Sequence, residues 1–323
     1  MIDRRCMYNK FIKYVDLAAM FNSMPSTKEL VGKDLDIFID IQSIYKDILK
    51  SEFMSSDIKM LSINVLNMAA HYRHYFRNQL NTFVRVYLVD SKEKLTGNLV
   101  QMSNNEEDLF KPVEVLCKYF PDIYYIRRTG YNPCSIIYEL INSHSSVYRG
   151  KLVISNDIYS YQLPNLFPST FLLHLGIKHK KLISSANSID AQFKNTTSSS
   201  DISPRLIPVL MALNKCDAIG MTLLYPYKTA LKMLKQSISK GIFTNAYNTP
   251  FEAIDGVIGI PGFYARWVVC DLVINALKYS NSPKILDTTW MAKRKVVFQE
   301  LASVIDDKVN TPEDILNYIY LTE

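Results

Sequence analysis

A short apolar run that ends in polar residues, near the middle of the chain, constrains the fold most strongly. Residues 152–154 are Leu-Val-Ile, and residues 155–157 are Ser-Asn-Asp. This pattern predicts a buried parallel strand that carries an acidic side chain to the carboxyl edge of a sheet. Ligand and active sites of α/β folds lie at that edge. We therefore expect an α/β fold with Asp157 at its functional site.

Two earlier segments have the same form. Residues 37–39 are apolar and end in Asp40, and residues 83–90 form a second predicted strand whose last residue is Asp90. Between them, residues 58–80 have the apolar spacing of a helix. Two roles stay open for Asp40: a carboxylate of the site, or the cap of a helix that we expect to begin near Ser43.

Composition indicates an ordinary globular protein. With 323 residues, 48% of them hydrophobic, the chain can form one large or two modest domains. The net charge of +6, from 37 lysines and arginines against 31 aspartates and glutamates, permits an acidic partner without demanding one. The five cysteines have no Cys-x-x-Cys spacing and indicate neither a disulfide framework nor a zinc site. The cysteine usage fits a reducing compartment, so we expect a cytoplasmic protein. No apolar run has the length of a membrane span, so we expect no membrane partner.

The segment after the central strand resembles the pattern Ser-Gly-Asp-x-Asp-x-x-Gln-Leu of the 5'-nuclease or flap endonuclease family, larger relatives of the PIN nucleases. Ser155, Asp157, Gln162 and Leu163 match this pattern. Tyr159 occupies the position of the second metal-binding Asp. The resemblance therefore comes together with the loss of one ligand.

The resemblance assigns further positions in the order in which the family has them. Asp40 and Asp90 correspond to its first and second acidic positions, and Asp217 to the second Asp of the pair before its hairpin. Lys228 and Thr229 match its hairpin motif. The implied fold is a PIN-like (flap endonuclease-like) parallel sheet flanked by helices, followed by a helical domain with a helix-hairpin-helix remnant.

A polar, serine-rich stretch at residues 195–201 gives the natural domain boundary. We expect an N-terminal helical lead-in over residues 1–35 and the PIN-like domain over residues 36–200. The helical domain with the degenerate hairpin region then covers residues 201–323.

Several positions of the family's machinery carry residues of another type. Its acidic cluster at the start of a helix falls on Asn132, Cys134 and Ser135. Its hairpin glycines, which let main-chain N–H groups approach a DNA backbone, fall on Leu224 and Pro226. The resemblance therefore implies weakened metal binding and a weakened grip on DNA.

Two charged stretches bear on nucleic-acid binding. Residues 91–128 correspond to the family's gateway for single-stranded DNA, but they include an acidic cluster, so we expect a solvated loop and then a helix over residues 113–119. Lys178, Lys180 and Lys181 form a basic patch that we expect to be a solvated turn, with phosphate contact as the alternative.

The retained acids Asp40, Asp90, Asp157 and Asp217 are the candidate metal ligands. Two-metal hydrolysis of a phosphodiester needs several carboxylates to hold two cations about 4 Å apart. We therefore expect no cofactor, or weakly bound Mg²⁺ or Mn²⁺, and we assign no catalytic residue.

Three functions follow as hypotheses. The favoured one is a catalytically degenerate, phage-encoded structural or interaction component of a virion or nucleoprotein assembly, with protein partners, located in the host cytoplasm or the virion. The alternative is a divergent metal-dependent 5'-3' exonuclease or flap endonuclease on DNA or RNA that recruits Glu139 or Asp122. The third is DNA binding without cleavage, through Lys228, Thr229 and the lysines of residues 178–181.

Overall fold

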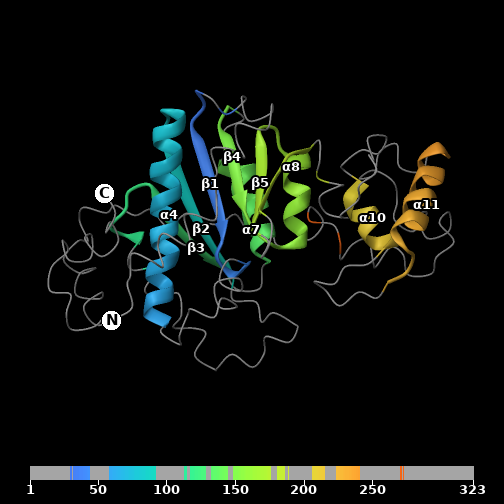
Figure 1. The fold of residues 1–323 in the computed structure, drawn as a ribbon, viewed down its shortest axis with the longest axis horizontal. Helices are drawn as coiled ribbons and strands as arrows, with labels where there is room; N and C mark the ends of the chain where they lie inside the picture. Colours follow the sequence, from blue (N-terminus) through green and yellow to red (C-terminus); the bar gives the residue numbers. More distant parts are fainter. Residues whose placement is uncertain are drawn as a thin grey trace.

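A six-stranded sheet with helices on both faces forms the centre of the computed structural model (Figure 1). The structure describes residues 30, 32–43, 58–91, 113–114, 117–128, 132–144, 148–175, 180–185, 188, 206–214, 223–240, 270 and 272. Its elements, in chain order, are β1 (Leu35–Asp40), α4 (Ile58–Leu80), β2 (Val84–Ser91), β3 (Ile123–Arg128), α7 (Pro133–His144), β4 (Gly150–Ile154), η2 (Ile158–Gln162), α8 (Leu163–Leu166), β5 (Thr170–Leu175), β6 (Lys180–Ile183), α10 (Ile207–Leu213) and α11 (Tyr227–Ser239).

The sheet has the order β3-β2-β1-β4-β5-β6, and β1 to β5 are parallel. The expectation of a parallel sheet is wrong for the last strand, because β6 runs antiparallel to β5. Only residues 176–179 separate these two strands, and a parallel return needs a crossover of about a dozen residues or more. The expected basic turn is also wrong in part, since Lys180 and Lys181 belong to β6; Lys178 lies outside the described residues.

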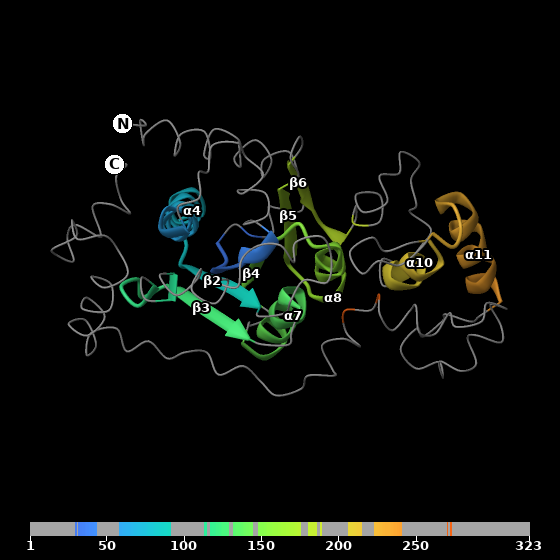
Figure 2. The ribbon, with the colours of Figure 1, turned by 90° about the horizontal axis from the view of Figure 1, so that it is seen from below.

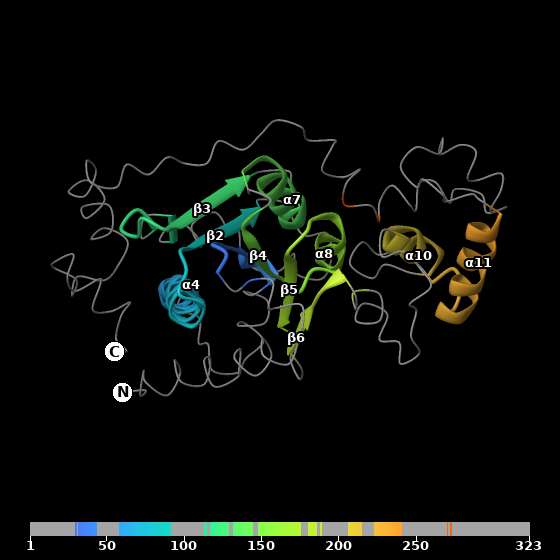
Figure 3. The ribbon, with the colours of Figure 1, turned by 90° about the horizontal axis from the view of Figure 1, so that it is seen from above.

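The two faces of the sheet hold separate hydrophobic clusters. Leu35, Ile37 and Ile39 of β1 pack in the cluster that contains α4, whereas Phe38 packs in the cluster that contains α7 and Leu163 of α8. Figures 2 and 3 show α4 on one side of the sheet and α7 and α8 on the other. Because both faces are covered, β1 is buried along its whole length, and its apolar residues form a continuous run.

A row of stacked aromatic rings fixes the register of three strands. Phe38, Tyr87 and Tyr124 lie opposite one another on β1, β2 and β3. The ring centroids are 4.9 Å apart between Phe38 and Tyr87 and 5.1 Å apart between Tyr87 and Tyr124. Such cross-strand aromatic pairs stabilise a pairing register. The sequence analysis did not identify β3, because it assigned residues 91–128 to a loop and a helix.

A pair of arginines neutralises Asp36 at the amino end of the sheet. Arg85, opposite Asp36 on β2, donates to both carboxylate oxygens at 2.8 and 2.9 Å. Arg149, just before β4, donates to the same carboxylate at 3.0 Å. The charge of this buried residue is therefore fully compensated, as burial of a carboxylate requires.

A separate cluster contains α10 and α11, which lie beyond α8 in Figure 1. Gln162 at the end of η2 connects the sheet region to residues 270 and 272. Its side-chain amide donates to the carbonyl of Cys270 at 2.8 Å and accepts from the backbone N–H of Leu272 at 3.0 Å. Most of the predicted lead-in lies outside the described residues, and the division at residue 200 stays a prediction. No helix in the described part of the chain could cross a membrane.

We predict that Gln162→Ala weakens the junction between the sheet region and residues 270–272. The substitution removes the hydrogen bonds of Gln162 to the carbonyl of Cys270 and to the backbone N–H of Leu272, and each such bond contributes about 0.5–1.5 kcal/mol. Urea unfolding followed by circular dichroism should therefore show a lower midpoint. Gln236→Ala, at an exposed position of α11, is the matched control and should leave the midpoint unchanged. Equal midpoints for the two variants would show that the junction carries no stability.

Candidate metal and nucleic-acid sites

The sheet changes its direction of winding between β1 and β4. From β1 the chain continues to β2 and β3 on one side, then returns past β1 to β4 and β5 on the other. Sites of open α/β sheets lie outside the carboxyl ends of the strands at such a switch point. Asp40 is the last residue of β1, and residues 155–157 follow β4 directly, so the two acid-bearing segments meet there.

Asp40 is buried, with 1% of its surface exposed. Ser155 Oγ donates to Asp40 Oδ2 at 2.8 Å, and the backbone N–H of Ser43 donates to Oδ1 at 3.1 Å. A helical turn begins at Ile41, so Asp40 both caps this turn and faces the β4 segment. Burial, together with the negative charge of Asp157, raises the pKa of Asp40 to about 6.

Asp157 caps the next short helix, η2. Its Oδ1 accepts from the backbone N–H of Tyr159 at 2.8 Å, and its Oδ2 accepts from the Asn132 amide at 3.3 Å. Tyr159, at the position of the family's second Asp, is buried among the apolar residues on the α7 face. The segment therefore keeps its turn geometry while one acidic position has become part of the core.

Cys134 completes a group that the sequence analysis did not assign as a site. It lies in the first turn of α7, where its backbone N–H donates to Asn132 Oδ1 at 2.7 Å. Ligand atoms of Asp40, Cys134 and Asp157 all lie within 4.8 Å of one another. Burial and the charges of the two carboxylates raise the pKa of the Cys134 thiol well above its usual value. The signal that could have found it is the family's acidic position falling on a cysteine at a helix start.

Asp90 lies at the same edge of the sheet but has basic and hydroxyl partners. Tyr125 Oη donates to Asp90 Oδ2 at 2.8 Å, and Arg127 Nε lies 3.2 Å from the same oxygen. Gln42 also donates to Asp90, at 3.4 Å, and to the carbonyl of Ser91. Burial raises the pKa of Asp90, opposed by Tyr125 and Arg127. Much of its charge is therefore compensated within the protein.

Neither acid proposed as a recruited ligand belongs to this group. Arg128 Nη1 lies 3.6 Å from Glu139 Oε2, so Glu139 pairs with the carboxyl end of β3. Asp122 precedes β3, at its amino end, and forms an ion pair with Arg73 of α4. Asp217 lies outside the described residues, so the structure does not place it.

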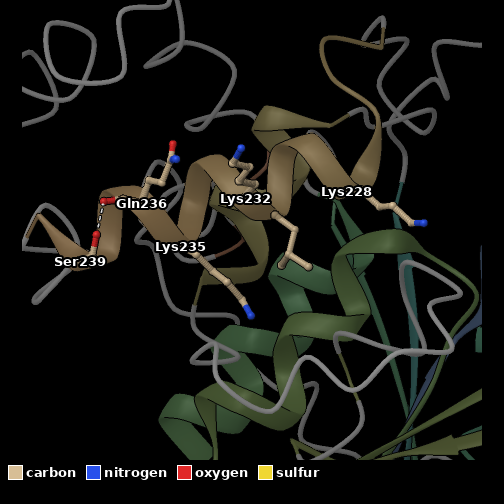
Figure 4. A pocket seen from close by; sticks show the side chains of 6 residues that line it. Lys228, Lys232, Lys235, Gln236 and Ser239 are labelled. Atoms are coloured by element: carbon tan, nitrogen blue, oxygen red, sulfur yellow. Dashed lines mark hydrogen bonds between the residues drawn. The ribbon is translucent and has the colours of Figure 1, made fainter.

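The exposed face of α11 carries the predicted hairpin residues. Lys228 and Thr229 are exposed in its first turn. Lys232 and Lys235, which the sequence analysis did not single out, are exposed further along the helix. A groove of about 470 Å³ is lined by α11 residues that include all three lysines, whose side chains extend outward from the helix (Figure 4). The segment contains no Asp or Glu, so this face is positively charged.

We predict that Asp40 destabilises the metal-free protein as the pH rises. Its folded-state pKa lies above its unfolded value, so the folded chain holds the proton more tightly; the resulting stability is full below about pH 4 and lost as the pH passes about 6. A pKa raised from 3.8 to about 6 corresponds to about 3 kcal/mol. The free energy of unfolding of the wild type should therefore fall by about that amount relative to Asp40→Asn.

The measurement is urea unfolding with a chelator present, at several pH values from about 4 to 7. Ser155→Ala provides a second arm, because the bond from Ser155 lowers the pKa of Asp40 and its removal should move the transition to higher pH. If wild type and Asp40→Asn lose or gain stability in parallel over this range, the carboxyl does not titrate as we infer.

Comparison with solved structures finds similar proteins, although no protein-family model and no curated protein sequence matches the chain. The T5 D15 protein, crystallised with metal ions, is 9% identical, with a TM-score of 0.50, over 84% of this chain and 99% of that one. A bacteriophage T5 flap endonuclease, as a pseudo-enzyme–product complex with DNA and metal ions, is 11% identical, with a TM-score of 0.49, over 88% of this chain and 99% of that one. The catalytic core of Rad2 in complex with a DNA substrate is 14% identical, with a TM-score of 0.48, over 90% of this chain and 92% of that one.

The likeness to the T5 D15 protein agrees with the element order and with the mostly parallel, mixed sheet flanked by helices. The chain has the PIN-like fold of the 5'-nucleases and flap endonucleases.

Proposed function

We propose that this chain is a catalytically degenerate, phage-encoded flap endonuclease-like protein that acts by binding, as a structural or interaction component of a virion or nucleoprotein assembly. The observation that carries the proposal is the donor set at the switch point. In the part of the chain that the structure describes, the group that could hold a metal consists of Asp40, Asp157 and the thiol of Cys134.

These residues do not fit a pair of hard cations. Two Mg²⁺ or Mn²⁺ ions need oxygen ligands, including several carboxylates, to offset their charge and hold them about 4 Å apart. At the start of α7 the available side chains are those of Asn132, Cys134 and Ser135, and the side-chain oxygen Oδ1 of Asn132 already accepts from the Cys134 backbone N–H. Neutral groups at these positions leave the mutual repulsion of two ions uncompensated.

Arginines also take up the charge of nearby acids. Arg127 pairs with Asp90, and Arg128 with Glu139. To recruit either acid, a metal ion would have to replace a guanidinium partner that is part of the folded protein. This arrangement supports a binding function more than a divergent nuclease.

The hairpin before α11 supports the same conclusion. The backbone N–H of Leu224 donates to the carbonyl of Asn214 at 2.9 Å, and that of Tyr225 to the carbonyl of Leu213 at 3.2 Å. Donors engaged inside the protein are not available to a phosphate backbone. These residues therefore do not offer free main-chain N–H groups for binding a DNA backbone.

Exposed aromatic side chains at the amino end of the sheet support a protein partner. Phe83 is 44% exposed and Tyr148 is 84% exposed. Arg149, next to Tyr148, lies over the Phe83 ring at 5.9 Å from its centroid. Aromatic residues and arginine are enriched in the centres of protein interfaces.

We predict that the purified chain does not cleave flap, 5'-overhang or single-stranded DNA, nor RNA, with excess Mg²⁺ or Mn²⁺. The reason is the shortage of carboxylates for two ions. Labelled substrates on denaturing gels measure this, with Asp40→Ala as the control that separates a contaminating nuclease from the chain's own activity. Robust cleavage that Asp40→Ala abolishes would establish the divergent nuclease instead.

A second function, nucleic-acid binding without cleavage, is favoured by the lysine face of α11. Lys228, Lys232 and Lys235 are spaced so that they follow one side of a helix. Lysines that neutralise phosphates release counterions and produce sequence-independent, salt-dependent binding. Contact through these side chains needs no close approach of the hairpin backbone.

We predict that replacing the three lysines with glutamine weakens DNA binding and lowers its salt dependence. The slope of log affinity against log salt should fall by up to about 0.9 for each phosphate that a lysine no longer neutralises. Fluorescence anisotropy with labelled single- and double-stranded DNA measures both quantities. Arg77→Gln, at an exposed position of α4, removes one positive charge elsewhere and is the control for Lys232→Gln, which removes one charge from α11. An equal reduction in that control would assign the effect to overall charge and not to α11.

A further inference from the structure

A thiol lies beside two carboxylates at the switch point of the sheet, and this donor set differs in kind from a site for hard cations. Asp40 comes from the end of β1, Cys134 from the first turn of α7, and Asp157 from the cap of η2. Their ligand atoms are within 4.8 Å of one another. We propose that these three residues form a mononuclear site for one thiophilic divalent cation of the zinc class.

The donor chemistry selects this class of ion. Thiolate ligands favour zinc and other late transition metals, whereas Mg²⁺ prefers carboxylate, carbonyl and water oxygens. Three protein ligands and one open position are the usual arrangement of a zinc site that also holds water. Zinc bonds of about 2.0 Å to oxygen and about 2.3 Å to sulfur place the donor atoms roughly 3.5 Å apart. The donor atoms of the present group, within 4.8 Å of one another, would have to approach more closely around an ion.

Neighbouring groups already orient both carboxylates. Ser155 and Ser43 donate to the two oxygens of Asp40, and Tyr159 and Asn132 donate to those of Asp157. A carboxylate oxygen has two lone pairs, so it can accept a hydrogen bond and bind a metal at the same time. Hydrogen-bonded partners of this kind fix ligand geometry in metal sites.

Two further observations concern hydrogen bonding and charge at these residues and their chain neighbours. Ser135, next to Cys134, is 1% exposed, and in the described part of the chain its Oγ has no hydrogen-bond partner. Such buried orphan atoms are rare and call for a water or an ion. Among the described residues, Asp36 and Asp90 have arginine partners, whereas no lysine or arginine forms a salt bridge with Asp40. A bound cation would supply the missing charge.

The inference goes beyond the proposed function, because it requires neither catalysis nor a partner. A single ion would join β1, the start of α7 and the segment after β4. Metal binding and the absence of cleavage can therefore be tested separately, and failure of one leaves the other intact.

The test uses the full chain, freed of metal with a chelator and then titrated with Co²⁺ as a spectroscopic probe. We expect near-ultraviolet thiolate-to-Co²⁺ charge-transfer absorption that saturates at one equivalent. Zn²⁺ should displace the Co²⁺ stoichiometrically and raise the melting temperature, and Mg²⁺ in large excess should do neither. No charge-transfer absorption, or displacement by Mg²⁺, would overturn the proposal.

Matched variants assign the ligands. Cys134→Ser should abolish the absorption and weaken Zn²⁺ binding by about 100-fold or more, since even outer-sphere partners cost about 10- to 100-fold. Cys117→Ser, at a cysteine buried in the cluster on the other face of the sheet, should leave both unchanged. Absorption that persists in Cys134→Ser, or is lost in Cys117→Ser, would refute the assignment.

Asp157→Asn is a second test, for use if circular dichroism shows that Cys134→Ser does not fold. Asp157 is only partly buried, so its substitution disturbs the core less. We expect this variant to retain thiolate absorption at high Co²⁺ but to bind Zn²⁺ at least about tenfold more weakly. Unchanged Zn²⁺ affinity would exclude Asp157 as a ligand and the proposed site with it.

Discussion

The interaction on which the site depends is the bond from Ser155 Oγ to the buried carboxyl of Asp40, 2.8 Å long. It joins the carboxyl ends of β1 and β4, the two strands between which the sheet reverses its winding. The same hydroxyl accepts from the backbone N–H of Asp157 at 3.0 Å. Ser155 therefore links Asp40 and Asp157. The negative charges of these two carboxylates repel each other.

Proteins resolve such repulsion by protonation, by internal cations or by bound ones. This chain uses arginines for Asp36 and Asp90, which makes those acids parts of the scaffold. Among the described residues, Asp40 has serine hydrogen-bond donors and no arginine or lysine ion pair. The contrast within one sheet is the physical basis for treating the switch point as a binding site and the remaining acids as structural.

The ligands at the switch point bear on both catalysis and metal binding. Too few carboxylates meet for two hard cations, which argues against hydrolysis. The two carboxylates that do meet, together with the thiol of Cys134, suit a single softer ion. On α11, the exposed lysines Lys228, Lys232 and Lys235 are side chains other than the three proposed metal donors.

The sequence by itself determined the fold class, β1, β2 and β4, and the span of α4, because buried parallel strands and amphipathic helices have distinct apolar periods. It also placed Asp40, Asp90 and Asp157 at strand ends. It missed β3, whose tyrosines and arginines do not form a plain apolar run, and the antiparallel direction of β6, which depends on pairing. Only the tertiary structure decided which acids converge, which ones pair with arginine, and that Cys134 joins Asp40 and Asp157. These contacts link residues far apart in the chain, and local patterns carry no information on the distances between them.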